Sequence, residues 1–271
     1  MNVERETTAD AALDRPEIVQ ALFYPRREWR DEQDMAGELV LIPVAPEVVV
    51  SGRFHLLVPR GPALLFFHGN GEIAADYTDI ALIFGQRGMN LLAVDYRGYG
   101  RSSGRPTVTS MLRDSHAIYA YTRQWLQERG AMGPLLVMGR SLGSASALEL
   151  GTAYADELDG LIIDSGFAYS NTLLALVGMN LEKLGLTEER AFRNLAKIAR
   201  FYKPVLIIHG EWDELLPLRE AKDLFAACPS SVKRLLVVPR AGHNDILAIG
   251  LPAYLEALSW LCKQLQGLSP R

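Results

Sequence analysis

A serine, a histidine and an aspartate occupy positions in this sequence from which each could take part in nucleophilic catalysis. Ser141 lies in G-R-S-L-G, between an apolar run and a stretch of small residues. A serine hydroxyl is a weak nucleophile until an imidazole accepts its proton, and a carboxylate must orient that imidazole and stabilise its charged form. His243, in P-R-A-G-H-N-D, and Asp213, in H-G-E-W-D-E-L-L-P, would supply these groups. The chemistry expected from this set is acyl transfer.

Ser141 can project from the sheet only if the chain turns sharply at that residue. G-x-S-x-G between an apolar strand and a helix is typical of such a turn, in which small residues two before and two after the serine avoid steric crowding. L-L-V-M before Gly139 predicts the strand, and the small residues after Gly143 permit close packing of a helix on the sheet. The amino terminus of that helix would direct N–H groups towards a developing oxyanion.

His243 is favoured as the base among five histidines because of its place in the chain. It follows the strand run L-L-V-V in a glycine-containing loop, from which its side chain can reach over the carboxyl edge of the sheet. Asp213 follows the preceding strand run, so it would lie at the same edge. Asp164, which ends G-L-I-I-D, and Glu214, beside Asp213, are alternatives for the acid. His209, inside V-L-I-I-H-G, is expected to pack or to make a local hydrogen bond.

The elements that would position these residues form an alternating pattern of short apolar runs and longer amphipathic stretches. This pattern predicts an α/β fold with a mostly parallel sheet and helices on both faces. The first two strands are expected to be antiparallel, in a meander that leads into the sheet. We predict strands at 38–44, 48–58 and 135–138, and within the runs A-L-L-F-F-H-G-N (63–70), N-L-L-A-V-D-Y-R-G (90–98), G-L-I-I-D-S-G (160–166), P-V-L-I-I-H-G (204–210) and K-R-L-L-V-V-P (233–239). Helices are expected at about 74–88, 108–129, 142–155, near 218–227 and at 245–266.

The interval 166–202 is too long for an ordinary connection between a strand and a helix. It contains the helix-like L-T-E-E-R-A-F-R-N-L-A-K-I-A-R and predicts a short helical cap or lid; a plain helix with an extended loop is the alternative. No linker composition interrupts the chain, so residues 1–271 are expected to form a single domain. Disorder is expected over about residues 1–12.

Composition and charge argue against several classes of partner. The chain has 271 residues, a net charge of -4 and no basic runs, which disfavours binding to nucleic acid or anionic membranes. No apolar run of 18 residues and no signal-peptide core occur, so we expect a cytoplasmic protein without an integral membrane segment. Cys228 and Cys262 have no metal-binding spacing and are expected to be free thiols.

Taken together, the motifs resemble the α/β-hydrolase superfamily, particularly small serine esterases. The chain order Ser141, Asp213, His243 is the order typical of that superfamily. The resemblance extends from about residue 56 to 261 and rests on H-G-N-G (68–71), D-Y-R-G-Y-G-R-S-S-G (95–104), G-R-S-L-G (139–143), N-L-A-K-I before P-V-L-I-I-H-G-E-W-D, and G-H-N-D.

The resemblance implies an α/β-hydrolase fold with an eight-stranded type of sheet, and it assigns roles to the matching positions. Ser141 would be the nucleophile, His243 the general base and then acid, and Asp213 the orienting carboxylate. The backbone N–H groups of Asn70 and Leu142 would form the oxyanion hole. No metal or organic cofactor is implied. His68 would brace the loop that carries Asn70.

The expected reaction is hydrolysis of a carboxylic ester of a small, uncharged or lipid-like acyl compound. A serine at the turn, where dehalogenase and epoxide-hydrolase relatives place aspartate, argues against alkyl-enzyme chemistry, and the apolar N-T-L-L-A-L-V-G-M in the expected cap suits an acyl group. The alternatives are an acyl-thioesterase or depalmitoylase-like enzyme, an amidase or peptidase, and a non-catalytic α/β-hydrolase that binds a small molecule or a partner.

Three arginines near these motifs also have expected roles. Arg140, inside the G-x-S-x-G turn, would form a structural ion pair or border the pocket. Arg97 and Arg101 are expected to brace loops, because their segment lacks the lysine and serine or threonine pair of a phosphate-binding loop.

Overall fold

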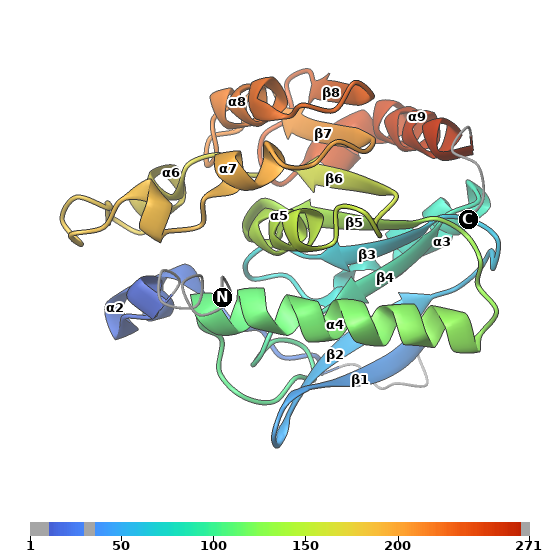
Figure 1. Ribbon diagram of the computed structural model, residues 1–271, viewed down its shortest axis with the longest axis horizontal. Coiled ribbons are helices and arrows are strands. Elements are labelled where there is room, and N and C mark those ends of the chain that lie inside the picture. Colours follow the sequence, from blue (N-terminus) through green and yellow to red (C-terminus); the bar gives the residue numbers. More distant parts are fainter. Residues whose placement is uncertain (1–10, 30–35, 267–271) are drawn as a thin grey trace.

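The strands form one sheet in the order β1-β2-β4-β3-β5-β6-β7-β8. The computed structural model describes residues 11–29 and 36–266, and Figure 1 shows helices on both sides of the sheet. The strands are β1 (Glu38–Ala45), β2 (Val48–His55), β3 (Ala63–Phe67), β4 (Asn90–Val94), β5 (Leu135–Arg140), β6 (Gly160–Asp164), β7 (Val205–Gly210) and β8 (Lys233–Val238). The helices are α2 (Pro16–Leu22), α3 (Thr78–Gln86), α4 (Val108–Glu128), α5 (Ser144–Ala153), α6 (Ser170–Ala175), α7 (Asn194–Ile198), α8 (Arg219–Ala227) and α9 (Ile246–Gln266), with 3-10 turns η1 (Ala11–Leu13), η3 (Ala74–Tyr77), η4 (Ser141–Gly143) and η5 (Glu188–Arg190).

The pairing of the strands brings several loops to one edge of the sheet. β3 to β8 run parallel, whereas β1 pairs antiparallel with β2 and β2 antiparallel with β4. The predicted antiparallel start and parallel remainder are therefore confirmed, but β2 lies beside β4, so the expected meander into the following strand is wrong. The chain places β4 on one side of β3 and β5 on the other, and a crevice at such a switch point is a usual ligand site in α/β sheets.

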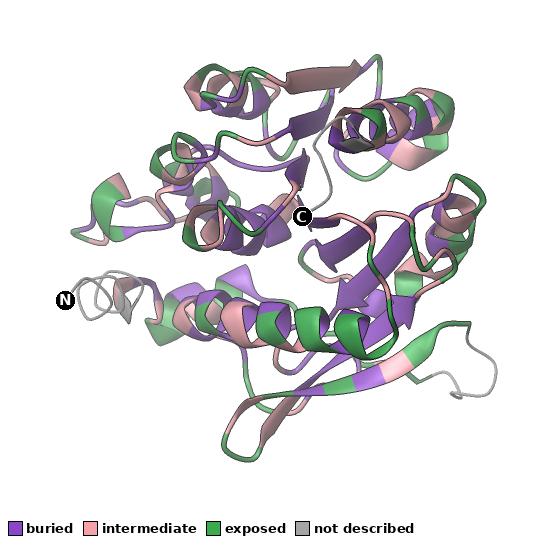
Figure 2. Ribbon diagram, turned by 45° about the vertical axis from the view of Figure 1, so that its right-hand side comes forward, coloured by how far each residue is buried: buried purple, intermediate pink, exposed green. Residues whose placement is uncertain are grey.

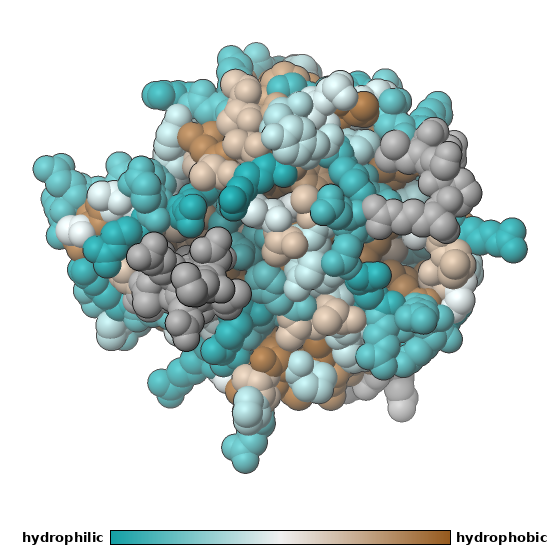
Figure 3. Space-filling model, viewed as in Figure 1, coloured by the Kyte–Doolittle hydropathy of each residue, from teal (hydrophilic) through white to brown (hydrophobic). Residues whose placement is uncertain are grey.

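Both faces of the central strands are buried, which explains their nearly continuous apolar sequences. Along β3, Leu65 and Phe67 join the core under α4, α5 and α8, whereas Leu64 and Phe66 join the core under α3 and α9. Figure 2 shows the same burial along the middle of the sheet. The outer surface of the layer that contains α4 and α5 is largely hydrophilic (Figure 3), as expected for amphipathic helices.

Residues 166–202, the segment expected to form a cap and called the cap segment below, contain short elements rather than one long helix. The helix-like stretch is divided into η5 and α7, and Arg193 between them has a φ of 59°, which ends regular helix. Asn194 donates a hydrogen bond of 2.8 Å to the carbonyl oxygen of Phe167, and Phe192 N–H donates to Ser170 Oγ at 3.0 Å. These contacts across the cap segment replace the helical pattern that the local sequence favours.

The described chain differs from the sequence prediction at its amino-terminal end, whereas the helix expected at 245–266 is observed as α9. Disorder was expected over about residues 1–12, of which residues 1–10 lie outside the described residues. Ala11–Leu13 form η1. The helix α2 was not predicted. α9 is, among the described residues, the one helix that by length and composition could cross a membrane. It packs against β7 and β8, with Tyr254, Leu258 and Leu261 buried.

Candidate active site

Ser141 lies where β5 turns through η4 into α5. Its φ is 51°, in the left-handed region that strains a residue with a side chain. A Cβ at Gly139 would collide with the carbonyl oxygen of Gly143, and a Cβ at Gly143 would collide with that of Phe67. Ser144 Oγ donates a hydrogen bond of 2.6 Å to the carbonyl oxygen of Ser141. Close approach of backbone segments therefore requires both glycines.

The structure brings Ser141, His243 and Asp213 together in one hydrogen-bonded line. His243 Nε2 lies 2.9 Å from Ser141 Oγ, and His243 Nδ1 lies 2.8 Å from Asp213 Oδ2. The other oxygen of Asp213 accepts hydrogen bonds from the N–H groups of Leu215 and Leu216, at 3.0 and 2.7 Å. These contacts fix the carboxylate and, through it, the imidazole, which is the arrangement needed to activate a serine hydroxyl.

The electrostatic environment keeps Asp213 ionised. Burial opposes its negative charge, but the hydrogen bond from His243 and the positive charge of that imidazole when protonated outweigh burial and lower the pKa of Asp213. His209 is buried beside it, with Nε2 at 2.6 Å from the carbonyl oxygen of Leu216, in the local hydrogen bond that we expected.

The two alternative acids make different contacts. Asp164 Oδ2 accepts a hydrogen bond of 2.8 Å from Tyr254 Oη, and burial raises the pKa of Asp164. Glu214 Oε2 accepts from the backbone N–H of His243 at 3.3 Å. The carboxylate in contact with the imidazole ring of His243 is therefore that of Asp213.

The loop after β3 lies beside the serine turn because β3 pairs with β5, with Phe67 opposite Gly139. Asn70, in this loop, and Leu142, the residue after Ser141, both line the same cavity as Ser141. His68 is buried, and its carbonyl oxygen accepts a hydrogen bond of 2.6 Å from Tyr96 Oη. The geometry places both expected oxyanion residues next to Ser141.

The side chain of Asn70 anchors this loop to two other parts of the chain. Asn70 Oδ1 accepts a hydrogen bond of 2.6 Å from Tyr99 Oη and one of 2.8 Å from the backbone N–H of Tyr24. Tyr99 is fully buried. Neither contact was predicted from the sequence, since both partners lie far from Asn70 in the chain.

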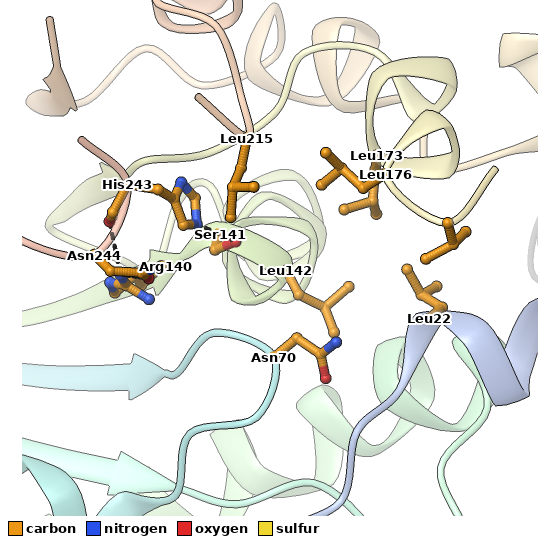
Figure 4. Close-up of a pocket in the computed structure, with 11 residues that line it drawn as sticks. Leu22, Asn70, Arg140, Ser141, Leu142, Leu173, Leu176, Leu215, His243 and Asn244 are labelled. Carbon is orange, nitrogen blue, oxygen red and sulfur yellow. Dashed lines mark hydrogen bonds between the residues drawn. The ribbon is translucent and has the colours of Figure 1, made fainter. Parts of the chain in front are cut away.

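Arg140 both forms an ion pair and borders the cavity, whereas one or the other was expected from the sequence. Its Nη1 pairs with Glu72, and its Nη2 donates to the carbonyl oxygen of His243 at 2.8 Å and to Asn244 Oδ1 at 3.2 Å. Figure 4 shows Arg140 next to His243 and Asn244. The guanidinium thus contacts the loop that carries the candidate base.

Glu72 links the same guanidinium to the loop after β3. Its Oε2 accepts hydrogen bonds from the N–H of Gly69 at 2.7 Å and from Tyr77 Oη at 2.6 Å. Burial opposes ionisation of Glu72, but the charge of Arg140 and the hydrogen bonds from Tyr77 and Gly69 act together against burial and lower the pKa of this carboxyl. Sequence reasoning missed Glu72, whose only local signal is its position just after H-G-N-G.

Arg97 and Arg101 brace loops, as predicted. Arg97 Nε lies 2.6 Å from Asp114 Oδ2, and Arg101 Nε lies 3.2 Å from Glu28 Oε2. Both pairs hold the segment after β4, and none of the four residues in these pairs lines the cavity.

A cavity of about 210 Å³ opens beside Ser141. Its walls combine a polar end near His243 with an apolar region, and Figure 4 shows most of these side chains. The lining residues are Leu22, Asn70, Arg140, Ser141, Leu142, Leu173, Leu176, Val177, Leu215, His243 and Asn244. Within residues 11–29 and 36–266, no group of three His, Cys, Asp or Glu side chains is arranged to hold a metal ion.

Leu22 is the lining residue that sequence reasoning missed most completely. It ends α2, whose signals are modest: Pro16 at the first helical position and the apolar pair Ile18 and Leu22 at a spacing of four. A helix of seven residues, about two turns, gives a pattern too short to be distinguished from other short apolar spacings in the sequence.

Comparison with known proteins agrees with this fold. Residues 59–186 match the family described as serine aminopeptidase, S33. An uncharacterised protein of Mycobacterium tuberculosis is 33% identical over 220 residues, which cover 78% of this chain and 73% of the relative. Human alpha/beta hydrolase domain-containing protein 17B is 32% identical over 206 residues, covering 74% of this chain and 66% of its own length. The chain belongs to the α/β-hydrolase superfamily.

Solved structures of hydrolases share the fold. An esterase of Pyrococcus furiosus superposes with a TM-score of 0.70 at 20% identity, covering 90% of this chain and 99% of the esterase. A monoacylglycerol lipase of Paleococcus ferrophilus gives a TM-score of 0.61 at 17% identity, over 79% of this chain and 99% of the lipase. The predicted α/β-hydrolase fold, with a mostly parallel sheet of eight strands, is confirmed.

Proposed function

We propose that this protein is a serine hydrolase that cleaves carboxylic esters through an acyl-enzyme on Ser141. The observation that carries the proposal is the contact of 2.9 Å between Ser141 Oγ and His243 Nε2, at the polar end of an otherwise apolar cavity. The esterase and the lipase with which this chain shares its fold are both ester hydrolases by name, which supports the proposed class of reaction.

The proposed reaction has two halves. Ser141 Oγ attacks the acyl carbon while its proton moves to His243 Nε2, and Asp213 stabilises the imidazolium from 2.8 Å. The backbone N–H groups of Asn70 and Leu142 stabilise the oxyanion. The intermediate collapses as His243 returns the proton to the leaving alcohol. Water then attacks the acyl-enzyme with His243 again as base, which releases the acid and restores the serine.

The charge of the cavity favours esters over peptides with a free amino terminus. Arg140 lines the cavity, and none of the described lining residues is Asp or Glu. A substrate ammonium group placed there would lose hydration without gaining a carboxylate partner, which is unfavourable. An uncharged acyl group has no such cost, so the match to an aminopeptidase family supports a common fold more than a common substrate.

The size of the cavity favours short or medium acyl groups over long ones. Its volume of about 210 Å³ is below the roughly 300–1,000 Å³ of pockets that enclose drug-sized ligands. A palmitoyl group would extend beyond such a cavity, which weighs against the depalmitoylase-like alternative.

The proposal is tested by measuring kcat/KM for p-nitrophenyl esters from acetyl to palmitoyl, beside matched acyl-thioesters and aminoacyl p-nitroanilides, with Ser141→Ala as the blank. A Ser141-dependent optimum on short or medium oxygen esters is expected. Preference for long thioesters or for anilides would replace the ester proposal by a thioesterase or a peptidase. If the folded protein hydrolysed none of these substrates and did not label with a fluorophosphonate at Ser141, a non-catalytic binder would be the better description.

A further inference from the structure

The apolar part of the cavity is bounded by two helices from distant parts of the chain. Leu22 comes from α2, whereas Leu173 belongs to α6 and Leu176 and Val177 follow it directly. Figure 4 shows Leu22 on one side of the cavity and Leu173 and Leu176 on the other, with Ser141 towards the polar end. α2 precedes the residues 59–186 that match the family, so the family match does not include this part of the wall.

The wall formed by α2 is tightly attached to the rest of the protein. Leu22 is only 3% exposed and Ile18 is fully buried, so one face of the helix packs on the core. Beyond the helix, the N–H of Tyr24 donates to Asn70 Oδ1 at 2.8 Å, and the N–H of Gly100 donates to the carbonyl oxygen of Arg26 at 2.8 Å. The segment is therefore held against the loops that follow β3 and β4, and Leu22 has a fixed position.

The opposite wall is held within the cap segment. The carboxylate of Glu188 accepts hydrogen bonds from the N–H groups of Ser170 and Asn171, at 3.0 and 3.1 Å, at the amino terminus of α6. Leu173 is buried, whereas Leu176 is 45% exposed and lies at the outer part of the cavity. The space between α2 and α6 is thus apolar on both sides and continuous with Ser141.

We propose that the acyl chain of the substrate lies between α2 and α6, and that Leu22 sets the longest aliphatic chain that the enzyme accepts. This inference rests on the proposed ester hydrolysis and specifies its substrate class as esters of short or medium aliphatic acids. Each methylene buried between the helices raises kcat/KM by roughly fourfold, the factor that corresponds to burial of one CH₂. The gain ends where the chain meets Leu22.

The experiment measures kcat/KM for p-nitrophenyl esters from acetyl to palmitoyl in the wild-type protein and three variants. It compares the octanoyl-to-acetyl ratio and the chain length at which kcat/KM is highest. Leu22→Trp fills the space and should lower the octanoyl-to-acetyl ratio by at least tenfold. Leu22→Ala enlarges it and should move the optimum to a longer chain. Gln20→Trp introduces the same indole on the exposed face of the same helix and should leave the ratio unchanged.

Two results would overturn the inference. One is an equal effect of Leu22→Trp on both esters in a protein whose circular dichroism and melting temperature match the wild type. The other is an unchanged optimum in Leu22→Ala, which keeps the test decisive if Leu22→Trp does not fold. Failure of the proposed function is recognised separately, because the wild-type protein would then cleave no ester. Ser141-dependent hydrolysis of the acetyl ester by the wild-type protein therefore shows that the two results above concern the acyl site alone.

Discussion

Arg140 Nη2 donates a hydrogen bond of 2.8 Å to the carbonyl oxygen of His243, so the residue before the candidate nucleophile holds the loop of the candidate base. The same guanidinium pairs with Glu72, which accepts a hydrogen bond from Gly69 in the loop that carries Asn70. Three separate segments that meet at the cavity are therefore connected through one side chain. This connection makes Arg140 a positioning residue in the proposed mechanism.

Replacing Arg140 by Gln should lower kcat by about 10- to 100-fold with a smaller change in KM, because a displacement of about 1 Å in a catalytic group can cost 100-fold. The measurement is the steady-state hydrolysis of p-nitrophenyl acetate. Arg97→Gln is the matched control, since Arg97 and Arg140 are both 13% exposed and both ion-paired. Similar losses of kcat in Arg140→Gln and Arg97→Gln would show that Arg140 contributes only to stability and does not position the catalytic groups.

Ser141→Ala should lower kcat by roughly a million-fold, by analogy with serine-protease nucleophile deletions, and leave the circular dichroism spectrum unchanged. The side chain makes its polar contact with His243, so its removal costs chemistry more than packing. Turnover of the purified variant, measured after prior inactivation of contaminating esterases, checks this prediction. Activity near the wild-type level would eliminate Ser141 as nucleophile.

Asp213→Asn should lower kcat by about 10,000-fold, because an amide favours the wrong imidazole tautomer. Asp164→Asn, which changes a carboxylate bonded to Tyr254, should have a much smaller effect. The comparison uses kcat for the same ester in both variants. The reverse order of effects would assign the orienting role to Asp164.

Tyr99→Phe should reduce kcat by about 10-fold and leave KM nearly unchanged, since it removes the hydroxyl that donates to Asn70 Oδ1. Loss of an oxyanion donor costs about 100- to 1,000-fold, and a loosened donor should cost part of that. Tyr154→Phe, at a hydroxyl that contacts His116 instead, serves as the control. An unchanged kcat for Tyr99→Phe would show that the loop keeps its position without this bond.

Glu149 links folding stability to pH. Burial opposes its charge, but His116 and Lys197 outweigh burial and lower the pKa of Glu149 from 4.5 to about 2. A carboxyl with a lowered folded-state pKa stabilises the fold above its unfolded-state pKa, and this contribution of up to roughly 3 kcal/mol is lost as pH falls from 4.5 towards 2. Urea unfolding should therefore give a larger stability difference between wild type and Glu149→Gln at pH 7 than at pH 3.5. A constant difference would contradict this linkage.

The strands, and the residues that meet at the candidate site, could be predicted from the sequence because their signals are local. The two-sided burial of β3 produces an apolar run, and the crowding at Gly139 and Gly143 leaves a recognisable pattern. In contrast, the contacts of Asn70 with Tyr24 and of Arg140 with His243 join residues 46 and 103 positions apart. No local periodicity encodes such pairs. The division of the cap segment at Arg193 likewise depends on tertiary contacts.

Leu22 and Ser141 belong to parts of the chain that are held in place by different contacts. Ser141, Asp213 and His243 stand on strand ends whose spacing is fixed by the sheet, whereas Leu22 stands on a peripheral helix attached through Tyr24 and Arg26. If Leu22 limits the acyl chain as proposed, exchange of residues 11–29 between homologous proteins should alter acyl preference while Ser141, Asp213 and His243 keep their positions, provided that the new segment retains the N–H contact to Asn70 Oδ1. Under this proposal, acyl preference can change without a mutation at the sheet edge, and residues 11–29 are a practical unit for chimeric enzymes.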